Sequence, residues 1–299
     1  MSSLRINLLC LMMISTTVFG ACRIEDRFIF HPDHVTDRDP HHIGLRFEDV
    51  FFTTQDGLRL HGWLIPHQDA RATLVWFHGN AGNISDRLLN IKLLHDRIPT
   101  DIFIFDYRGY GRSEGTVSEK GTYLDGEAAI NYLLGRDDAA ARRLILFGRS
   151  LGAAVAAEMA IRFNSSGLIL ESPFVSVREM ARAIFPSLPI AWLLRTRYDT
   201  IEKVRLIKTP LLVLHGDRDA TVPFAQGKKV FEVASEPKKF HRIVGASHND
   251  TFVVGGEEYY RALREFIESA LAANEGLSCR LSAALHLGVD DERNDHLYG

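Results

Sequence analysis

The 299-residue chain has little cysteine, little net charge and no repeats. Its three cysteines, Cys10, Cys22 and Cys279, are too few for a disulfide framework, and no two have metal-ligand spacing. The net charge of −3 gives no reason to expect nucleic acid as a partner. Ordinary globular composition, with 46% hydrophobic and 24% charged residues, allows one large α/β domain. We therefore expect an enzyme or binding domain without a metal or cofactor.

The N-terminal segment is apolar but short for a membrane-spanning helix. Residues 6–22 carry no charge, and these 17 residues fall below the roughly 20 that a spanning helix needs. They are typical of a secretory signal peptide. Because Gly20 and Ala21 directly precede Cys22, the segment resembles the lipobox of bacterial lipoproteins. We therefore expect a signal peptide over residues 1–21, a lipid on Cys22, and location in the bacterial cell envelope. Simple cleavage after Ala21 and an uncleaved anchor are the alternatives.

Two polar segments flank the part of the chain that reads as a folded domain. Residues 22–44 are interpreted as a tether; a metal-binding tract is the alternative, because the segment contains four histidines, but no acidic or cysteine partners have suitable spacing. Residues 275–299 are interpreted as a frayed polar tail. The domain is therefore expected over residues 45–274.

Between these limits, short apolar runs alternate with helical patterns. Two strand-like runs, 45–52 and 58–65, surround an Asp-Gly turn signal and predict a hairpin. The later strands are expected at residues 73–77, 101–105, 144–147, 167–171, 210–214 and 239–244. Helices are expected at residues 84–98, 118–134, 153–163, 223–233 and 257–272. Such alternation predicts an α/β fold with a mainly parallel sheet, helices on both faces, and the hairpin as an antiparallel edge.

One stretch interrupts the alternation. Residues 173–208 contain three prolines and many apolar side chains, and they are the only insertion long enough to cover a site. We expect a small cap there. A simple amphipathic connection is the alternative, and the two interpretations are compatible.

A G-x-S-x-G pattern occurs twice, and the context distinguishes the copies. The copy around Ser150 lies between an apolar strand and an alanine-rich helix, which is the setting of a nucleophile elbow. Glycines are needed two residues before and after the serine, because side chains there would collide with the neighbouring strand and helix. The copy around Ser113 is flanked by loop-like residues. Ser150 is therefore the predicted nucleophile, and Ser113 is interpreted as a polar loop residue.

Three motifs in series resemble a known family. They are His-Gly-Asn-Ala-Gly-Asn at 78–83, Asp-Tyr-Arg-Gly-Tyr-Gly-Arg-Ser-Glu-Gly at 106–115, and Gly-Arg-Ser-Leu-Gly at 148–152. Residues 45–272 resemble the serine α/β-hydrolases, above all membrane-associated members that include protein depalmitoylases. The set is similar to monoacylglycerol lipases and prolyl-peptidase-like domains. The resemblance implies the α/β-hydrolase fold and acyl-transfer chemistry, without fixing the substrate.

A serine nucleophile needs a base and an acid, which follow it in the order Ser, acid, His. Asp217 and Asp219 both follow a predicted strand, and the resemblance to the family's H-G-x-x-D-x-x-V-P segment favours Asp219. Of the thirteen histidines, only His248 lies between the last strand and the last helix. The earlier His78 and His215 are interpreted as loop-holding residues.

The reaction also needs donors for the oxyanion. The backbone N–H of Leu151, at the start of a helix, is one predicted donor, and that of Asn80, in the loop after the 73–77 strand, is the other. The sequence thus predicts a hydrolase of carboxylic esters or thioesters, acting on a small-molecule or lipid-like acyl substrate. A serine peptidase and a non-catalytic binding protein are the alternatives. The oligomeric state is not predicted.

Overall fold

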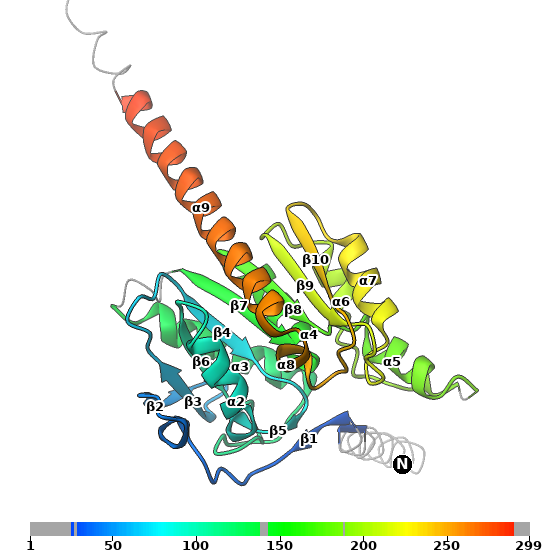
Figure 1. Cartoon of the computed structure of the whole chain (residues 1–299). Coiled ribbons are helices and arrows are strands. Elements are labelled where there is room, and N and C mark those ends of the chain that lie inside the picture. Colours follow the sequence, from blue (N-terminus) through cyan, green and yellow to red (C-terminus); the bar gives the residue numbers. More distant parts are fainter. Residues whose placement is uncertain (1–24, 27–28, 138–142, 188, 290–299) are drawn as a thin grey trace, which may run out of the picture.

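The computed structural model describes residues 25–26, 29–137, 143–187 and 189–289. The predicted signal peptide, residues 1–21, and the predicted lipidation site, Cys22, lie outside these ranges. The main strands are β2 (Glu48–Thr53), β3 (Arg59–Ile65), β4 (Thr73–Phe77), β6 (Asp101–Phe105), β7 (Leu144–Arg149), β8 (Gly167–Glu171), β9 (Leu211–Gly216) and β10 (Lys238–Ile243). Within the described residues they form one eight-stranded sheet, in the order β10-β9-β8-β7-β4-β6-β3-β2 (Figure 1).

The sheet is parallel except at one edge. Strands β10, β9, β8, β7, β4 and β6 pair in parallel. Strand β3 pairs antiparallel with both β6 and β2, so the predicted hairpin forms the antiparallel edge. Gly57, in the Asp-Gly turn of this hairpin, has a φ of 85°, a value that glycine adopts without strain.

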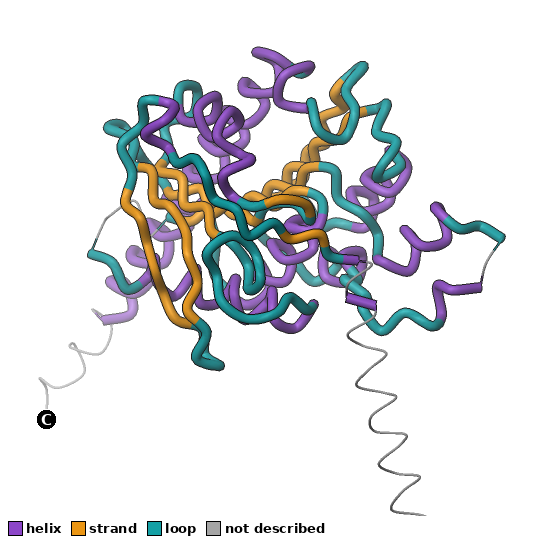
Figure 2. Tube along the Cα trace, turned by 90° about the horizontal axis from the view of Figure 1, so that it is seen from below, coloured by secondary structure: helices purple, strands orange, loops and turns teal. Residues whose placement is uncertain are grey.

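Helices cover both faces of the sheet, as Figure 2 shows in the view from below. They are α2 (Leu88–His95), α3 (Glu119–Leu134), α4 (Leu151–Arg162), α5 (Val177–Ile184), α6 (Thr200–Val204), α7 (Phe224–Val233), α8 (Thr251–Val254) and α9 (Gly256–Val289). Buried side chains of α3, α4, α6 and α7 share one core cluster with the sheet. Those of α2 and α9 share the cluster on the other face.

The central strands are apolar throughout because both of their faces are covered. Every residue of β4, β7, β8 and β9 is buried. Along β7, Leu146 packs into one cluster, while Ile145 and Phe147 pack into the other. This continuous run is typical of a parallel sheet between two helical layers.

The described residues of the predicted tether over 22–44, namely 25–26 and 29–44, lie against the domain. Phe30 is buried in the core. Strand β1 (His31–Pro32) pairs with β5 (Ala81–Gly82) in a separate two-stranded sheet. A 3-10 helix, η1 (Pro40–Ile43), follows, and Asp39 caps it. The polar composition of the segment does not indicate this packing, because the packing involves one buried aromatic residue, Phe30, and the backbone pairing of β1 with β5.

The C-terminal helix is longer than the sequence predicts. Helix α9 continues to Val289 and projects beyond the sheet (Figure 1). Residues 275–289 are therefore helical instead of a frayed tail, and they contain no proline to end the helix. Among the described helices, none combines the length and the apolar content that crossing a membrane requires.

Candidate active site

Ser150 lies on a sharp turn between β7 and α4. Its φ of 53° and ψ of −117° are unusual for a residue with a side chain, as at a strained elbow. The Ser150 N–H donates to the carbonyl of Glu171 on β8 over 2.9 Å, which ties the turn to the neighbouring strand. The serine thus stands just past the carboxyl end of a central strand.

The two glycines of the motif have the steric role that the sequence suggests. A Cβ on Gly148 would lie 2.4 Å from the carbonyl oxygen of Gly152 and 2.7 Å from the Cα of Ala153 in α4. A Cβ on Gly152 would lie 1.9 Å from the carbonyl oxygen of Phe77, at the end of β4. Both contacts are with backbone atoms, which cannot move aside as a flexible side chain can.

Asp219 lies in the turn after β9 and is buried. Its Oδ1 accepts hydrogen bonds from the N–H groups of Thr221 and Val222, at 2.9 and 2.7 Å. Its Oδ2 lies 2.7 Å from Nδ1 of His248 and 3.4 Å from Nε2 of His215. Burial alone would raise the pKa of Asp219, but hydrogen bonds from His215 and His248 outweigh it and hold that pKa below its usual range. The carboxylate is therefore ionised at neutral pH.

His248 lies in the loop between β10 and α8. An ionised Asp219 accepts a hydrogen bond from Nδ1, and this assigns the proton to Nδ1 and leaves Nε2 as the acceptor. The carbonyl of His248 accepts a hydrogen bond of 2.6 Å from Nη2 of Arg149, the residue that precedes the serine. The loop that carries the histidine is thereby held next to the turn that carries Ser150.

A buried network supports this contact. The Arg149 guanidinium also reaches Oδ1 of Asn249 at 3.2 Å, and its Nε lies 3.4 Å from Oε1 of Glu171. Glu171 is fully buried and accepts hydrogen bonds from the hydroxyls of Thr251 and Tyr259. The network joins β7 and β8 to the helices that follow the histidine. The sequence reveals none of it, because the partners are distant in the chain, up to 100 positions apart.

Asp217, the alternative acid, holds a different turn. Its Oδ2 accepts hydrogen bonds from Arg242, at 2.7 and 3.0 Å. Its Oδ1 accepts one from the N–H of Gly245 at 2.7 Å. The Arg242 bond and the Gly245 N–H hold the pKa of Asp217 below its usual range. The residue therefore links the ends of β9 and β10, away from the imidazole of His248.

His215 and His78 hold loops, as the sequence predicts. Nε2 of His215 lies 3.0 Å from the carbonyl of Val222. Its contact with Asp219 was not predicted, and Gly227 makes room for it, since a Cβ there would lie 2.0 Å from Nδ1 of His215. Burial lowers the pKa of His78 to about 3, so that imidazole is neutral. Its Nδ1 lies 2.7 Å from the carbonyl of Gly79.

Ser113, in the second copy of the pattern, is a buried structural residue. Its hydroxyl donates to the carbonyl of Asp106 over 2.7 Å and accepts from the N–H of His61 over 2.9 Å. Both bonds join the loop to β3 and to the end of β6. The hydroxyl thus both donates and accepts a buried hydrogen bond and is not free to attack a substrate.

The loop with the predicted oxyanion donor lies against Ser150. A Cβ on Gly79 would be 3.6 Å from the Cβ of Ser150, an ordinary van der Waals distance, so the two turns are neighbours. The Tyr110 hydroxyl donates to the carbonyl of Asn80 over 2.8 Å, and the Asn80 side chain donates to the carbonyl of Ile29. Leu151 is the first residue of α4, where N–H groups lack helical partners. Both predicted donors thus lie on turns that adjoin Ser150.

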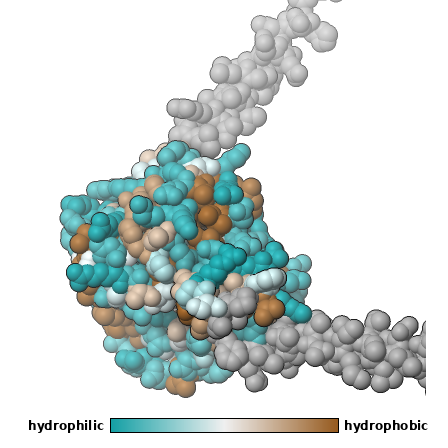
Figure 3. Space-filling view, turned by 90° about the vertical axis from the view of Figure 1, so that its right-hand side faces the viewer, coloured by the Kyte–Doolittle hydropathy of each residue, from teal (hydrophilic) through white to brown (hydrophobic). Residues whose placement is uncertain are grey.

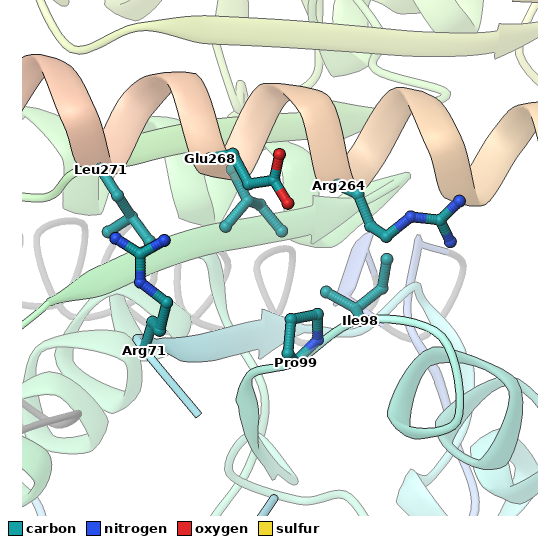
Figure 4. Close-up of a pocket in the computed structure, with 7 residues that line it drawn as sticks. Arg71, Ile98, Pro99, Arg264, Glu268 and Leu271 are labelled. Atoms are coloured by element: carbon teal, nitrogen blue, oxygen red, sulfur yellow. The ribbon is translucent and has the colours of Figure 1, made fainter. Parts of the chain in front are cut away.

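Two cavities lie elsewhere in the molecule, and neither is lined by Ser150, Asp219 or His248. One of about 40 Å³ lies between α9 and the loops before β4 and β6, lined by Arg71, Pro99 and Leu271 among others (Figure 4). It is at the amino end of the parallel strands, whereas sites in such sheets lie at the carboxyl end. The other, of about 340 Å³, includes Asp49, Trp63 and Arg112. Among the described residues, no cluster of three or more histidine, cysteine or acidic side chains could hold a metal ion.

Comparisons with known proteins give the family. A model of the family described as serine aminopeptidase, S33, matches residues 68–206. The chain is 34% identical over 249 residues to the alpha/beta hydrolase domain-containing protein WAV2 of Arabidopsis thaliana, covering 77% of this chain and 81% of WAV2. It is 34% identical over 275 residues to protein YfhR of Escherichia coli K12, covering 88% of this chain and 94% of YfhR.

A solved structure gives the same fold. The esterase Pf2001 of Pyrococcus furiosus superposes with a TM-score of 0.68 at 24% identity, covering 81% of this chain and 98% of that one. At this identity the likeness concerns the fold, and it confirms the α/β-hydrolase architecture that the sequence predicts. The relatives above, with the family model, establish that the chain belongs to the serine α/β-hydrolase family.

Proposed function

We propose that the protein is a serine hydrolase that cleaves carboxylic ester or thioester bonds through an acyl-enzyme. The observation that carries the proposal is the 2.7 Å contact between Nδ1 of His248 and Oδ2 of Asp219, with that loop tied to the elbow of Ser150. An imidazole oriented by a buried carboxylate, on a loop held next to the turn that carries the serine, is the arrangement that activates a hydroxyl.

In the proposed reaction, the Ser150 hydroxyl oxygen attacks the acyl carbonyl carbon, and its proton moves to Nε2 of His248. Asp219 stabilises the imidazolium that forms. The N–H groups of Leu151 and Asn80 donate to the oxyanion, and the α4 dipole adds to their effect. When the tetrahedral intermediate collapses, the leaving alcohol or thiol takes the proton from His248. Water then attacks the acyl-enzyme by the same steps, which releases the acid and restores the serine.

Amide hydrolysis is the second candidate, because the family model that matches residues 68–206 is described as a serine aminopeptidase. The same groups can cleave amides, but an amine is a poorer leaving group than an alcohol or thiol. The two candidates differ in one measurement: release of aminoacyl anilides faster than esters of matched size would favour the peptidase.

The test of the catalytic residues is Ser150→Ala in the full chain. We expect it to abolish fluorophosphonate labelling and p-nitrophenyl ester turnover. Ser113→Ala is the matched control, because it removes the serine from the other copy of the pattern. It should stay labelled at low temperature even if lost hydrogen bonds destabilise it by about 1 kcal/mol. Labelling retained by the Ser150 variant would refute the proposal.

Membrane attachment is a separate part of the proposal. The uncharged residues 6–22 and the small residues before Cys22 support a lipid-anchored protein of the cell envelope that acts on lipid-like acyl substrates. Cys22→Ala should lose palmitate incorporation and weaken the retention of the protein on the membrane. Cys279→Ala should change neither. Palmitate incorporation by the Cys22 variant equal to that of the wild type would refute the anchor.

A further inference from the structure

The predicted cap, residues 173–208, projects from the carboxyl edge of the sheet between β8 and β9. It contains α5, the 3-10 helix η4 (Pro189–Trp192), which contacts α5, and α6. The start of α5 is joined to the segment between η4 and α6, because the Val177 N–H donates to the carbonyl of Arg197 over 2.8 Å. In Figures 1 and 2, the loop beyond α5 extends away from the body.

Four large apolar side chains at the end of this cap are open to solvent. Ile184 and Phe185, where α5 ends, are 58% and 46% exposed, and Trp192 and Leu193, where η4 ends, are 75% and 76% exposed. We call these four residues the cap edge. Single exposed apolar residues are ordinary on a protein surface, but large side chains gathered at one projection mark an interaction site. Figure 3 shows that the surface facing right in Figure 1 is mostly hydrophilic, with patches of apolar residues.

Basic side chains surround the cap edge. Residues 177–197 contain four arginines against one acidic residue, Glu179. Arg182, Arg195 and Arg197 are exposed, and Arg182 also pairs with Glu179. Exposed aromatic and aliphatic groups with arginines beside them match the boundary between lipid headgroups and acyl chains.

The N-terminal segment reaches the body at the same place. The Glu25 carboxylate accepts hydrogen bonds from the N–H groups of Arg195 and Thr196, at 3.0 and 2.8 Å. Only two positions separate Arg195 from Leu193. The chain that follows the uncharged residues 6–22 is therefore fastened within a few residues of the cap edge. Any attachment of that segment to a membrane would bring the cap edge to the membrane surface.

We propose that the cap edge docks on a membrane rich in anionic lipid and inserts Trp192 and Leu193 among the headgroups. A lipid surface is the occupant because it accommodates apolar and basic groups together, and because the N-terminal attachment leads to it. Docking needs neither the serine chemistry nor a lipid on Cys22. Since the cap leaves the same edge of the sheet as Ser150, docking would hold the candidate site close to the bilayer.

The fluorescence of Trp192 can serve as a probe for this proposal. Of its three tryptophans, Trp63 and Trp76 are fully buried, and Trp192 is exposed. The full-length protein is reconstituted in phosphatidylglycerol-rich vesicles, with or without brominated acyl chains. Trp192 fluorescence should shift to shorter wavelength and be quenched by the brominated lipid, because insertion to about 5–10 Å brings the indole within reach. Trp192→Phe should remove the quenchable signal and so assign it.

Matched variants separate docking from simple attachment. Leu193→Asp should lower the docked fraction by about tenfold, whereas Leu89→Asp should not, since Leu89 is also exposed (59%) but lies on α2. Ser150→Ala should dock like the wild type, so failure of the proposed function would leave this result intact. Salt at about 0.5 M should weaken docking by screening the arginines.

Two results would overturn the proposal. The first is a membrane-bound protein in which Trp192 stays accessible to acrylamide and insensitive to brominated lipid, which would show that the N-terminus alone attaches it. The second is Trp192 protected in vesicle-free solution together with a dimeric mass, which would make the cap edge an interface between copies of the chain.

Discussion

At the scale of single residues, the candidate site depends on two glycines, Gly148 and Gly152, which have no side chain. Gly152 and Gly148 let α4 pass close to β4 and β7, and Ser150, between them, has a positive φ. The strain at the serine is maintained because the strand before it and the helix after it fix both ends of the turn.

We predict that Gly152→Ala will destabilise the protein by about 1–3 kcal/mol and abolish fluorophosphonate labelling. The added methyl group would overlap the carbonyl of Phe77, so the elbow must move. Gly135→Ala is the control, because a Cβ there would be 3.4 Å from the carbonyl oxygen of Asn131 and the φ of Gly135 is −77°. Denaturant unfolding and active-site labelling measure the two effects. Normal labelling of the Gly152 variant would contradict the steric account.

Asp125, on α3, gives a prediction about pH. Burial raises its pKa to about 6, although Arg108 opposes the shift through hydrogen bonds from its N–H and Nε, at 2.9 and 2.8 Å. The folded state therefore binds this proton more tightly than the unfolded state, in which the pKa is near 3.8. The stability that protonated Asp125 contributes is complete below pH 3.8 and is lost as the pH rises through about 6.

Replacing the carboxyl of Asp125 should weaken the dependence of the free energy of unfolding on pH. Between pH 4 and 6.5, the free energy of unfolding of the wild type should fall relative to that of Asp125→Asn by on the order of 2 kcal/mol. Urea titrations at several pH values measure the difference. Asp69→Asn, at an exposed loop position, should follow the wild type. Parallel curves for the wild type and the Asp125 variant would show that the pKa is not raised.

At the scale of elements, side chains of β7 and β8 hold the loop between β10 and α8 in place. Arg149 donates to the carbonyl of His248, and Glu171 accepts from Thr251 and Tyr259 beyond the loop. These buried contacts rest on rigid strands, so the loop adopts one arrangement beside the elbow. In the proposed function, Arg149 is thus a positioning residue, because it binds the carbonyl of His248 and not the imidazole.

We predict that Arg149→Met will lower kcat by roughly 10- to 100-fold with little change in KM, because the imidazole would lose its alignment while the substrate contacts remain. Arg149→Lys should recover part of the loss. Arg162→Met, which breaks a pair with Glu158 on α4, should leave kcat unchanged. Ester kinetics and circular dichroism separate misalignment from unfolding. An unchanged kcat in a folded Arg149→Met protein would remove the positioning role.

At the scale of the whole molecule, one sheet separates two cores. Strand β7 contributes Leu146 to one and Ile145 to the other, so neither layer of helices can detach without exposing the central strand. The cap and α9 are the parts that project from this body (Figure 1).

We predict that Leu146→Ala and Ile145→Ala will each cost about 2–5 kcal/mol, since both side chains are fully buried. Leu89→Ala, at an exposed position on α2, should change stability by less than about 0.5 kcal/mol. Thermal unfolding followed by near- and far-ultraviolet circular dichroism should give one transition for every variant. Separate transitions would show that the two cores unfold independently.

Local patterns were sufficient for much of this architecture. The apolar runs of β4, β7, β8 and β9 predict buried strands because a doubly covered strand must be apolar on both sides. Helix α3 begins where the sequence predicts, and Ser118 caps it, since a capping bond is made within a few residues. Boundaries were less accurate: the helix expected over 84–98 begins as the 3-10 turn Ile84–Arg87 and ends at His95.

By itself, the sequence predicted the family, the candidate residues Ser150, Asp219 and His248 in that order, and the need for glycines around Ser150, because each depends on a local pattern or on chain order. Only the tertiary structure decided which distant side chains meet. It revealed the link from Arg149 to the His248 loop, the contact of His215 with Asp219, and the packing of residues 29–44. It also left the cap edge uncovered, because burial depends on the elements that fold over a residue and not on that residue's own polarity.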